Sequence, residues 1–313
     1  MALPTGSFTG TSDISNLVKA AYDQYVRMAL RSIPVMRSLA DVKPVQQAMP
    51  GSSVVFSIYS DLAQATSTLT ETLDVSSIAL GNPSQVTVTL NEYGSAVTTT
   101  KKLNLTSFND VDAALADIIA YNAADSIDSV VAAVLTAGTN VIYGGNATTT
   151  NTIDSADTIS VADIRNAVTE LRTNKALPRL GELYAAYLHP RQAADLRAES
   201  GTGGFQDIVK YTDNVSKTII PGSVGVIEGA FVVETPRVPY AANTNSPAVN
   251  VYKAVVAGRE ALAEAMGQDI NTVIGPEIDA LRRFRTIGWY YFGGFARLRE
   301  AALYRIETSA SAG

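Results

Sequence analysis

The sequence predicts an α+β fold with two intermixed lobes. Apolar residues at helical spacing predict one long helix over residues 107–137, and alternating apolar and polar residues predict strands at residues 53–59 and 85–90. Hydrophobic residues make up 46% of the 313 residues, which supplies a substantial core. Charged residues make up only 17%, so the surface is either rich in Ser, Thr and Asn or covered by partners.

The N-terminal segment is expected to be a basic amphipathic helix. Apolar residues recur at helical spacing over residues 12–40, and Pro34 should end or kink the helix. The first residues lack the basic and apolar stretches of a signal peptide. No apolar run approaches the roughly 18–20 residues that span a bilayer, so no membrane partner is expected. The cations of this segment are Lys19, Arg27, Arg31 and Arg37.

Residues 60–84 form a long polar excursion between the two strands, which are able to pair with each other. Loops of this length inside a compact domain are uncommon, and most of them are functional or disordered. We interpret the segment as an extended hairpin arm that projects from the body. A flexible surface loop is the alternative interpretation.

The long helix is expected to begin at Ser107 or Asn109 and to stop at Gly138, a residue type that often ends helices. At 1.5 Å per residue it would be about 45 Å long, whereas a compact chain of this length has a radius of gyration of about 20 Å. The helix should therefore cross much of an elongated or flat subunit. Its apolar stripe consists of Val111, Leu115, Ile118, Ile119, Val130, Val131, Val134 and Leu135.

An acidic stripe accompanies this helix. No Lys, Arg or His occurs between Lys102 and Arg165, and three aspartates fall on one helix face at spacings of 7 and 11 residues. The stripe is either a solvated face or a docking strip for a basic element. Two such elements exist, the N-terminal helix and an arginine-rich segment near the C-terminus. The candidate subunit contacts are therefore Lys19, Arg27, Arg31, Asp110, Asp117, Asp128, Arg282 and Arg283.

The remainder of the chain alternates between short helices and strands. The segments, in order, are a loop at residues 139–158, a helix at 160–174 capped by Ser160, a strand at 182–188, a helix at 190–199, strand-like segments at 224–234 and 249–257, and an aromatic strand at 286–298.

Composition and motifs exclude several classes of function. The formal net charge is −6, whereas binding to nucleic acid of any sequence needs clustered cations. The chain has no cysteine and a single histidine, His189, so thiolate and imidazole metal sites lack ligands. No phosphate-binding loop or nucleophile elbow occurs. We therefore expect no enzyme, no catalytic residue, no metal and no cofactor, and we interpret His189 as a structural turn before Pro190.

The order of parts over roughly residues 15–308 resembles the major capsid protein of tailed bacteriophages, which has the Hong Kong 97 fold. The N-terminal helical arm and the helix at 107–137 belong to this pattern. The other stretches that carry it are Gly51-Ser-Ser-Val-Val-Phe, Thr89-Leu-Asn-Glu-Tyr-Gly94, Gly222-Ser-Val-Gly225-Val-Ile-Glu-Gly229-Ala-Phe-Val-Val-Glu234-Thr-Pro236, Ile287-Gly-Trp-Tyr-Tyr-Phe-Gly-Gly-Phe and Arg305-Ile-Glu-Thr.

The resemblance implies four parts and a structural function. These are an N-terminal arm (1–50), an extended loop (51–90), a peripheral domain (91–138 plus 282–313) with the spine helix at 107–137, and an axial domain (139–281). The subunit would self-assemble as hexamers and pentamers into an icosahedral virion capsid around double-stranded DNA, which it would contact weakly and without sequence specificity. Assembly in the host bacterial cytoplasm, procapsid maturation, a separate scaffolding protein, a portal and a decoration protein are further expectations.

Two alternatives stay open. A nanocompartment shell of the encapsulin type would share the fold and enclose an enzyme cargo. A hydrolase would use the scattered carboxylates of Glu228, Glu234 and Glu260, because paired carboxylates perform acid–base chemistry. Ordinary solvated carboxylates are the simpler interpretation of these three residues.

Overall fold

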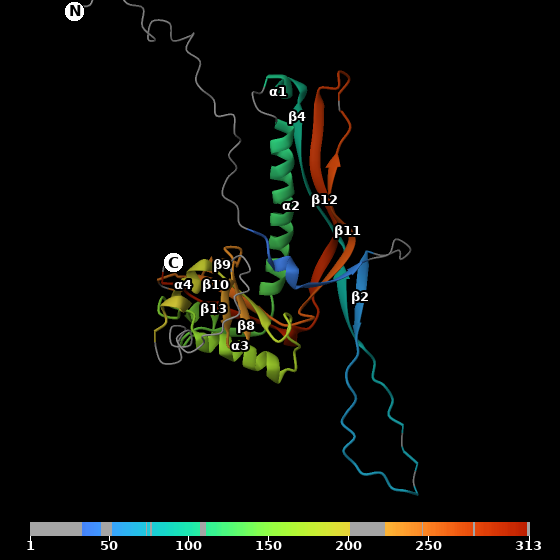
Figure 1. The fold of residues 1–313 in the computed structure, drawn as a ribbon, viewed down its shortest axis with the longest axis vertical. Helices are drawn as coiled ribbons and strands as arrows, with labels where there is room; N and C mark the ends of the chain where they lie inside the picture. The colour runs from blue at the N-terminus through green and yellow to red at the C-terminus, as the bar shows by residue number, and fades with distance from the viewer. Residues whose placement is uncertain are drawn as a thin grey trace, which may run out of the picture.

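The computed structural model describes two lobes and a projecting loop, which together form an elongated molecule (Figure 1). The described residues are 33–44, 52–72, 74–75, 77–106, 111–200, 223–245, 247–277 and 279–311.

The elongated lobe is a four-stranded sheet covered by one long helix (Figure 1). The strand order is β1-β11-β12-β4, with β1 parallel to β11 and the other pairs antiparallel. The helix packs on β12, the predicted aromatic strand, whose Trp289 and Tyr291 form part of the sheet side of the contact. The elements are η2 (Met36–Leu39), β1 (Ala40–Pro44), β4 (Asn91–Thr100), α1 (Lys101–Thr106), α2 (Val111–Thr136), β11 (Leu262–Ile274) and β12 (Phe284–Arg297).

Helix α2 confirms the predicted spine. Its 26 residues correspond to about 39 Å at 1.5 Å per residue. The helix ends two residues before Gly138, and the predicted caps Ser107 and Asn109 lie outside the described residues. The buried face differs in part from the predicted stripe, since Ile118 is 46% exposed. The buried positions follow a four-residue step: Leu115, Ile119, Ala123, Ile127, Val131 and Leu135.

The segment Leu115–Thr136 has the length and composition of a membrane span, contrary to the expectation that no segment does. Within the structure it carries Asp117, Asp125 and Asp128, and charges inside a bilayer are costly. Its buried face packs on the sheet of its own lobe. These are the properties of a core helix.

The compact lobe is a seven-stranded mixed sheet. Its path is β5-β13-β10-β6-β8-β7, with β9 paired to β10, and α3 packs on one face. The other face packs against α2 and η2, so one core cluster joins the two lobes. The elements are β5 (Val141–Tyr143), η3 (Thr150–Thr152), α3 (Val161–Thr173), β6 (Tyr184–Leu188), α4 (Pro190–Ala198), β7 (Ser223–Ile227), β8 (Ala230–Glu234), β9 (Tyr240–Ala242), β10 (Asn250–Ala257), η4 (Glu300–Ala302) and β13 (Leu303–Thr308).

Several local predictions for this lobe are confirmed. Ser160 caps α3 through a capping box with Asp163, and Pro190 opens α4 directly after His189. The strands predicted at 182–188 and 249–257 are β6 and β10. The loop predicted at 139–158 differs, because it contains β5 and η3.

The sheets divide the chain differently from the predicted domain boundaries. Strand β11 falls inside the range 139–281 expected for the axial domain, yet it pairs with β12 and β1 in the elongated lobe. Strand β13 falls inside the range 282–313 expected for the peripheral domain, yet it pairs with β10 in the compact lobe. Long-range strand pairing causes this difference, because a boundary drawn along the sequence cannot show which sheet a strand joins.

The predicted extended loop is confirmed as a projecting hairpin. Strands β2 (Ser53–Ile58) and β3 (Ser84–Thr89) pair antiparallel in full register, and the chain between them extends away from both lobes (Figure 1). The base of the hairpin is fixed to the elongated lobe by the buried side chains of Val88 and Leu90, which pack on Ala263 and Ala265 of β11.

The helix expected over residues 12–40 is wrong for residues 33–40, the part that the structure describes. Residues 12–32 lie outside the described residues. Beyond Pro34 the chain forms only the single 3-10 turn η2 and then continues as β1. Residues 40–44 lie parallel to β11, and this long-range pairing outweighs the local helical periodicity.

Candidate assembly surfaces

The N-terminal arm enters the body at a clamp made by one buried carboxylate of α2. The side chain of Asp128 accepts backbone N–H bonds from Val35 (3.4 Å), Met36 (2.7 Å) and Arg37 (3.1 Å). These are the unpaired amides at the start of η2, where a negative charge is favoured. Asp128 is only 1% exposed, so the bonds form away from water.

A second carboxylate holds the side chain of the same turn. The guanidinium of Arg37 binds Glu264 of β11, with a shortest contact of 2.6 Å, and also Asp269 at 3.1 Å. Tyr291 of β12 donates its hydroxyl to Glu264 at 2.9 Å. Glu264 is fully buried, so its bonds to Arg37 and Tyr291 compensate for the hydration that its carboxylate loses on folding.

Burial and charge shift the pKa values of this clamp. Burial raises the pKa of Asp128, and the three backbone amides offset only part of that effect. Burial alone would lower the pKa of Arg37. The hydrogen bonds that Arg37 donates to Glu264 and Asp269, and the negative charges of these two residues, outweigh burial and raise this pKa. Burial and the neighbouring charge of Glu264 raise the pKa of Tyr291. The clamp therefore holds Arg37 charged and Tyr291 neutral.

The clamp is also connected to the compact lobe. Arg237, which follows β8, forms ion pairs with Asp125 and Asp128 of α2. Arg179 reaches the arm from the loop after α3 and binds Asp41 at 2.7 Å. Both lobes thus hold residues 35–41 of the arm.

The extended loop is the first of two surfaces that expose large apolar side chains. Leu69 is 77% exposed at the far part of the loop, and the hydrophobic residues on both sides of it share this exposure. Large apolar side chains gathered on a projecting segment are typical of a protein–protein contact. The exposed set is Tyr59, Leu62, Leu69, Val75, Ile78 and Leu80.

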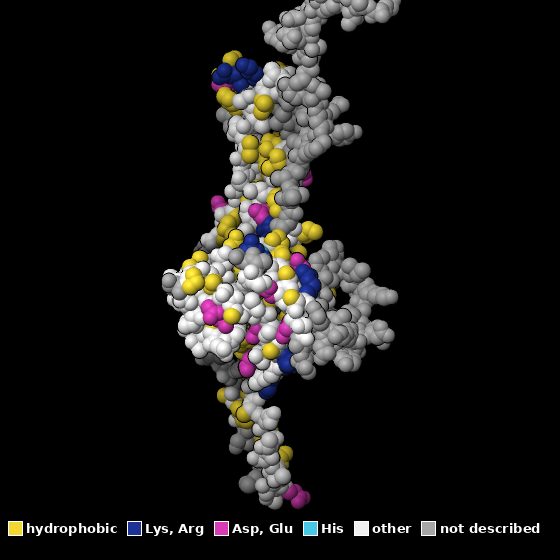
Figure 2. Space-filling view, turned by 90° about the vertical axis from the view of Figure 1, so that its left-hand side faces the viewer, with side chains coloured by type: hydrophobic (Ala, Val, Ile, Leu, Met, Phe, Trp, Pro, Cys, Tyr) yellow, Lys and Arg dark blue, Asp and Glu magenta, His cyan; other side chains and the backbone are white. Residues whose placement is uncertain are grey.

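The opposite end of the molecule carries a second uncovered surface, which we call the cationic end. Figure 2 shows its Lys and Arg side chains gathered at the tip of the elongated lobe. Leu105 is 77% exposed and Leu281 is 71% exposed among these charges. The cationic end consists of Lys101 and Lys102 of α1, Arg282 and Arg283 directly before β12, and Arg285 within β12.

The eight predicted contact residues have different positions. Arg282 and Arg283 are exposed at the cationic end, and Asp117 is exposed on α2. Asp128 is a correction to the expected acidic stripe, because it lies in the interior and binds the arm of its own chain through backbone amides instead of basic side chains. Four of the eight lie outside the described residues: Lys19, Arg27, Arg31 and Asp110.

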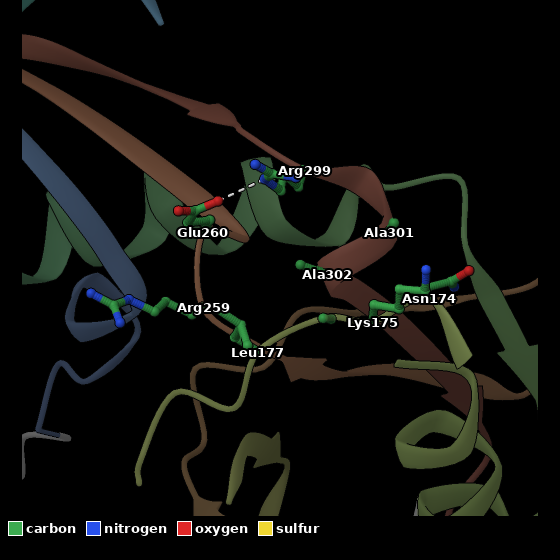
Figure 3. Close-up of a pocket in the computed structure, with 9 residues that line it drawn as sticks. Asn174, Lys175, Leu177, Arg259, Glu260, Arg299, Ala301 and Ala302 are labelled. Carbon is green, nitrogen blue, oxygen red and sulfur yellow. Dashed lines mark ion pairs between the residues drawn. The ribbon is translucent and has the colours of Figure 1, made fainter. Parts of the chain in front are cut away.

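The carboxylates considered for a hydrolase do not converge. Glu260 lines a cavity of about 210 Å³ and is paired there with Arg299 at 2.6 Å (Figure 3). Glu228 precedes β8 and Glu234 ends it, and each pairs with a different arginine, Arg165 or Arg197. Neither residue lines the cavity. This arrangement provides no acid–base pair.

His189 has the structural role that the sequence predicts, at the turn before Pro190. Its ring accepts a bond from the backbone amide of Arg191 and packs on Tyr252 at 4.6 Å between ring centres. Burial, and then the nearby charge of Arg191, lower its pKa. In the part of the chain that the structure describes, no group of three or more potential ligands could hold a metal ion.

The sequence did not predict the Asp128 and Glu264 clamp. Asp128 has the spacing of a solvated helix face, and Glu264 interrupts the apolar run of β11. Their partner on η2 is 91 residues away from Asp128 and 227 residues away from Glu264. The only local signal is Arg37, three residues after Pro34, near the end of the predicted helix.

Comparison with known proteins identifies the family. The family model described as phage capsid protein matches residues 9–311, and no curated protein matches. Among solved structures, the capsid of Ralstonia phage GP4 is similar with a TM-score of 0.76 and 15% identity, covering 98% of each chain.

Two further capsid structures show the same likeness. The acid-stable capsid of Helicobacter pylori bacteriophage KHP30 has a TM-score of 0.74 and 14% identity, over 98% of this chain and 100% of that one. The capsid asymmetric unit of cyanophage Pam1 has a TM-score of 0.72 and 13% identity, over 96% and 98%. The chain belongs to the phage capsid protein family and has the Hong Kong 97 fold, so it is a major capsid protein that forms a virion shell.

Proposed function

We propose that copies of this chain assemble as hexamers and pentamers into an icosahedral shell around double-stranded DNA. The observation that carries the proposal is the extended loop, whose apolar side chains project far from the core of their own chain. Burying them needs a neighbouring molecule, and each Å² of apolar surface removed from water contributes about 25 cal/mol. Because a shell contains many such contacts, their sum stabilises it even when each single contact is weak.

The four parts have distinct tasks in this proposal. The arm (1–50) and the extended loop (51–90) bind neighbouring subunits. The peripheral domain contains α2 and its sheet, and the axial domain contains the compact lobe and meets its copies at the five-fold and six-fold axes. The assignment of β11 and β13 to the two sheets supports a boundary that follows the sheets instead of the ranges 139–281 and 282–313.

The net charge of the chain bears on the partners that we propose. A net charge of −6 favours weak contact with DNA that has no sequence specificity. A separate scaffolding protein would guide assembly in the host cytoplasm, followed by procapsid maturation, and a portal and a decoration protein would complete the virion.

Negative-stain microscopy of the purified full chain tests the proposal. We expect closed shells or capsomer rings whose abundance increases with protein concentration. A single monomeric species at every concentration and ionic strength, with and without a co-expressed scaffolding protein, would contradict the proposal. Enclosed enzyme cargo instead of DNA in particles from the native source would favour the nanocompartment.

A further inference from the structure

We propose that a cavity between the N-terminal arm and the compact lobe binds a small, neutral, planar aromatic molecule that carries one hydrogen-bond donor. Indole is a simple molecule of this class. The inference goes beyond the proposed capsid function and does not depend on assembly. It rests on the size of the cavity, on its aromatic and apolar wall, and on one hydrogen-bond acceptor that the protein leaves unused.

The cavity lies where the arm root (residues 33–44) passes over the sheet of the compact lobe. Its floor consists of alternate residues of the neighbouring strands β6 and β8, which therefore share one face of the sheet. Val35 and Leu39 line the cavity from the arm side, and Leu180, which is partly exposed, lines it from the loop after α3. The floor residues are Ala185, Tyr187, Phe231 and Val233.

The size of the cavity suits an aromatic ring system. Its volume is about 200 Å³, whereas a protein cavity of about 150 Å³ lined by apolar side chains binds benzene. The floor belongs to the core cluster that joins the two lobes, and its side chains are buried. Tyr187 and Phe231 provide ring faces and edges on which a planar aromatic molecule packs favourably.

The hydroxyl groups in the wall leave one acceptor for a ligand. The hydroxyl of Ser38 donates to the carbonyl of Val35 at 2.7 Å, so the hydroxyl of Tyr187, 2.9 Å away, donates to Ser38. Burial raises the pKa of Tyr187, which keeps this hydroxyl protonated. Within the described residues no donor binds the phenolic oxygen, so its lone pairs are left for an N–H or O–H group in the cavity.

The charges at the rim disfavour an ionic ligand. Arg179 donates one terminal nitrogen to Asp41 at 2.7 Å and the other to the backbone carbonyls of Ser38 and Ala40. Both terminal nitrogens are thus occupied, and Asp41 balances the charge. A carboxylate or ammonium group would lose its hydration in this cavity without receiving a counter-charge. The ligand class is therefore neutral.

A molecule bound here would touch the arm root and the compact lobe at once, because residues of both line the cavity. Binding to the folded chain alone stabilises it by mass action. Indole at about ten times its Kd should therefore raise the melting temperature of the unassembled chain by about 2 °C.

Calorimetric titration of the unassembled full chain tests the binding. We expect indole to bind with a Kd of about 0.1–1 mM, the range for a small ligand that fills one cavity. The matched ligand is indene, which has the same shape but a CH₂ group in place of the N–H group. The preference for indole over indene should be about three- to tenfold greater in the parent than in Ser38→Ala/Tyr187→Phe, which removes both hydroxyls.

Filling the cavity provides a second test. Ala185 is the smallest residue of the floor, and Ala185→Leu should lower the affinity for indole at least about tenfold. The matched control is Ala301→Leu, which places the same side chain at the cavity beside Glu260 and should leave the affinity unchanged. If Ala185→Leu does not fold, the comparison of indole with indene decides alone, because it is made on the parent and on the variant without the two hydroxyls.

Three results would overturn the inference: no binding of indole by the parent at about 5 mM, full binding by folded Ala185→Leu, or an equal preference for indole over indene with and without the two hydroxyls. Binding by unassembled chains but not by shells would show that a side chain of a neighbouring molecule fills the cavity, and it would overturn the assignment to a small molecule. None of these results bears on the proposed capsid function, which the microscopy tests separately.

Discussion

The carboxylate of Asp128 accepts a 2.7 Å hydrogen bond from the backbone amide of Met36, 92 residues earlier in the chain. This bond joins the spine helix to the root of the N-terminal arm. The arm is proposed to bind neighbouring subunits, and this bond holds its described root, residues 33–44, on its own subunit.

Asp128→Ala should destabilise the subunit by about 2–4 kcal/mol, because it removes the acceptor of three buried or partly buried amides and a partner of Arg237. The free energy of unfolding from urea titrations measures the effect. Asp117→Ala, on the exposed face of the same helix, is the control and should change stability by less than about 0.5 kcal/mol. Equal effects of the two substitutions would contradict the clamp.

The pH dependence of stability should show the raised pKa of Asp128. Between the usual carboxyl value and the raised one, the folded chain binds the proton more tightly than the unfolded chain, so this contribution to stability falls as pH rises. Relative to Asp128→Asn, which does not titrate, the parent should therefore gain stability from about pH 7 to about pH 4. A relative loss on acidification would show that the pKa is lowered instead.

The only tryptophan of the chain reports on the contact between α2 and β12. Trp289 is 5% exposed and donates its indole N–H to Asn122 at 2.9 Å. Asn122→Ala should cost about 1 kcal/mol and change the tryptophan emission of the folded state. Asn122→Asp retains an acceptor and should keep most of the stability. An unchanged spectrum and stability in Asn122→Ala would argue against this bond.

Gly294 determines where the extended loop meets the sheet. A Cβ atom at Gly294 would overlap the backbone carbonyl of Thr89, at the end of β3. Gly294→Ala should therefore shift the base of the loop and cost more than about 1 kcal/mol. Gly81→Ala is the control, since a Cβ there meets nothing within 4 Å, and it should be neutral or slightly stabilising. Calorimetry of both variants tests the difference.

Leu69→Ser should separate folding from assembly. Leu69 is 77% exposed, so its removal should change the melting temperature of unassembled subunits very little. The loss of apolar contact with a neighbour should reduce the yield of shells in electron micrographs. Thr70→Ser is the control and should assemble like the parent. Normal shells from Leu69→Ser would exclude this leucine from the interface.

Local patterns predicted much of the fold. The capped helix α3, the paired strands of the hairpin and the long helix α2 follow from short-range periodicity, capping residues and turn residues. Strand β11 was not predicted, because Glu264 interrupts its apolar run and is compensated in the core only by Arg37 and Tyr291, which are distant in sequence. The same long-range dependence explains why β1 replaces the end of the expected N-terminal helix.

The sequence by itself determined the spine, the projecting loop and the separation of acidic from basic segments, because these depend on neighbours along the chain. Only the tertiary structure decided which charged groups face water. Asp117 and Asp128 belong to the same stripe of one helix, yet Asp128 alone is buried. The reason is physical: a carboxylate leaves water only where distant donors replace its hydration, and those donors come together only in the folded chain.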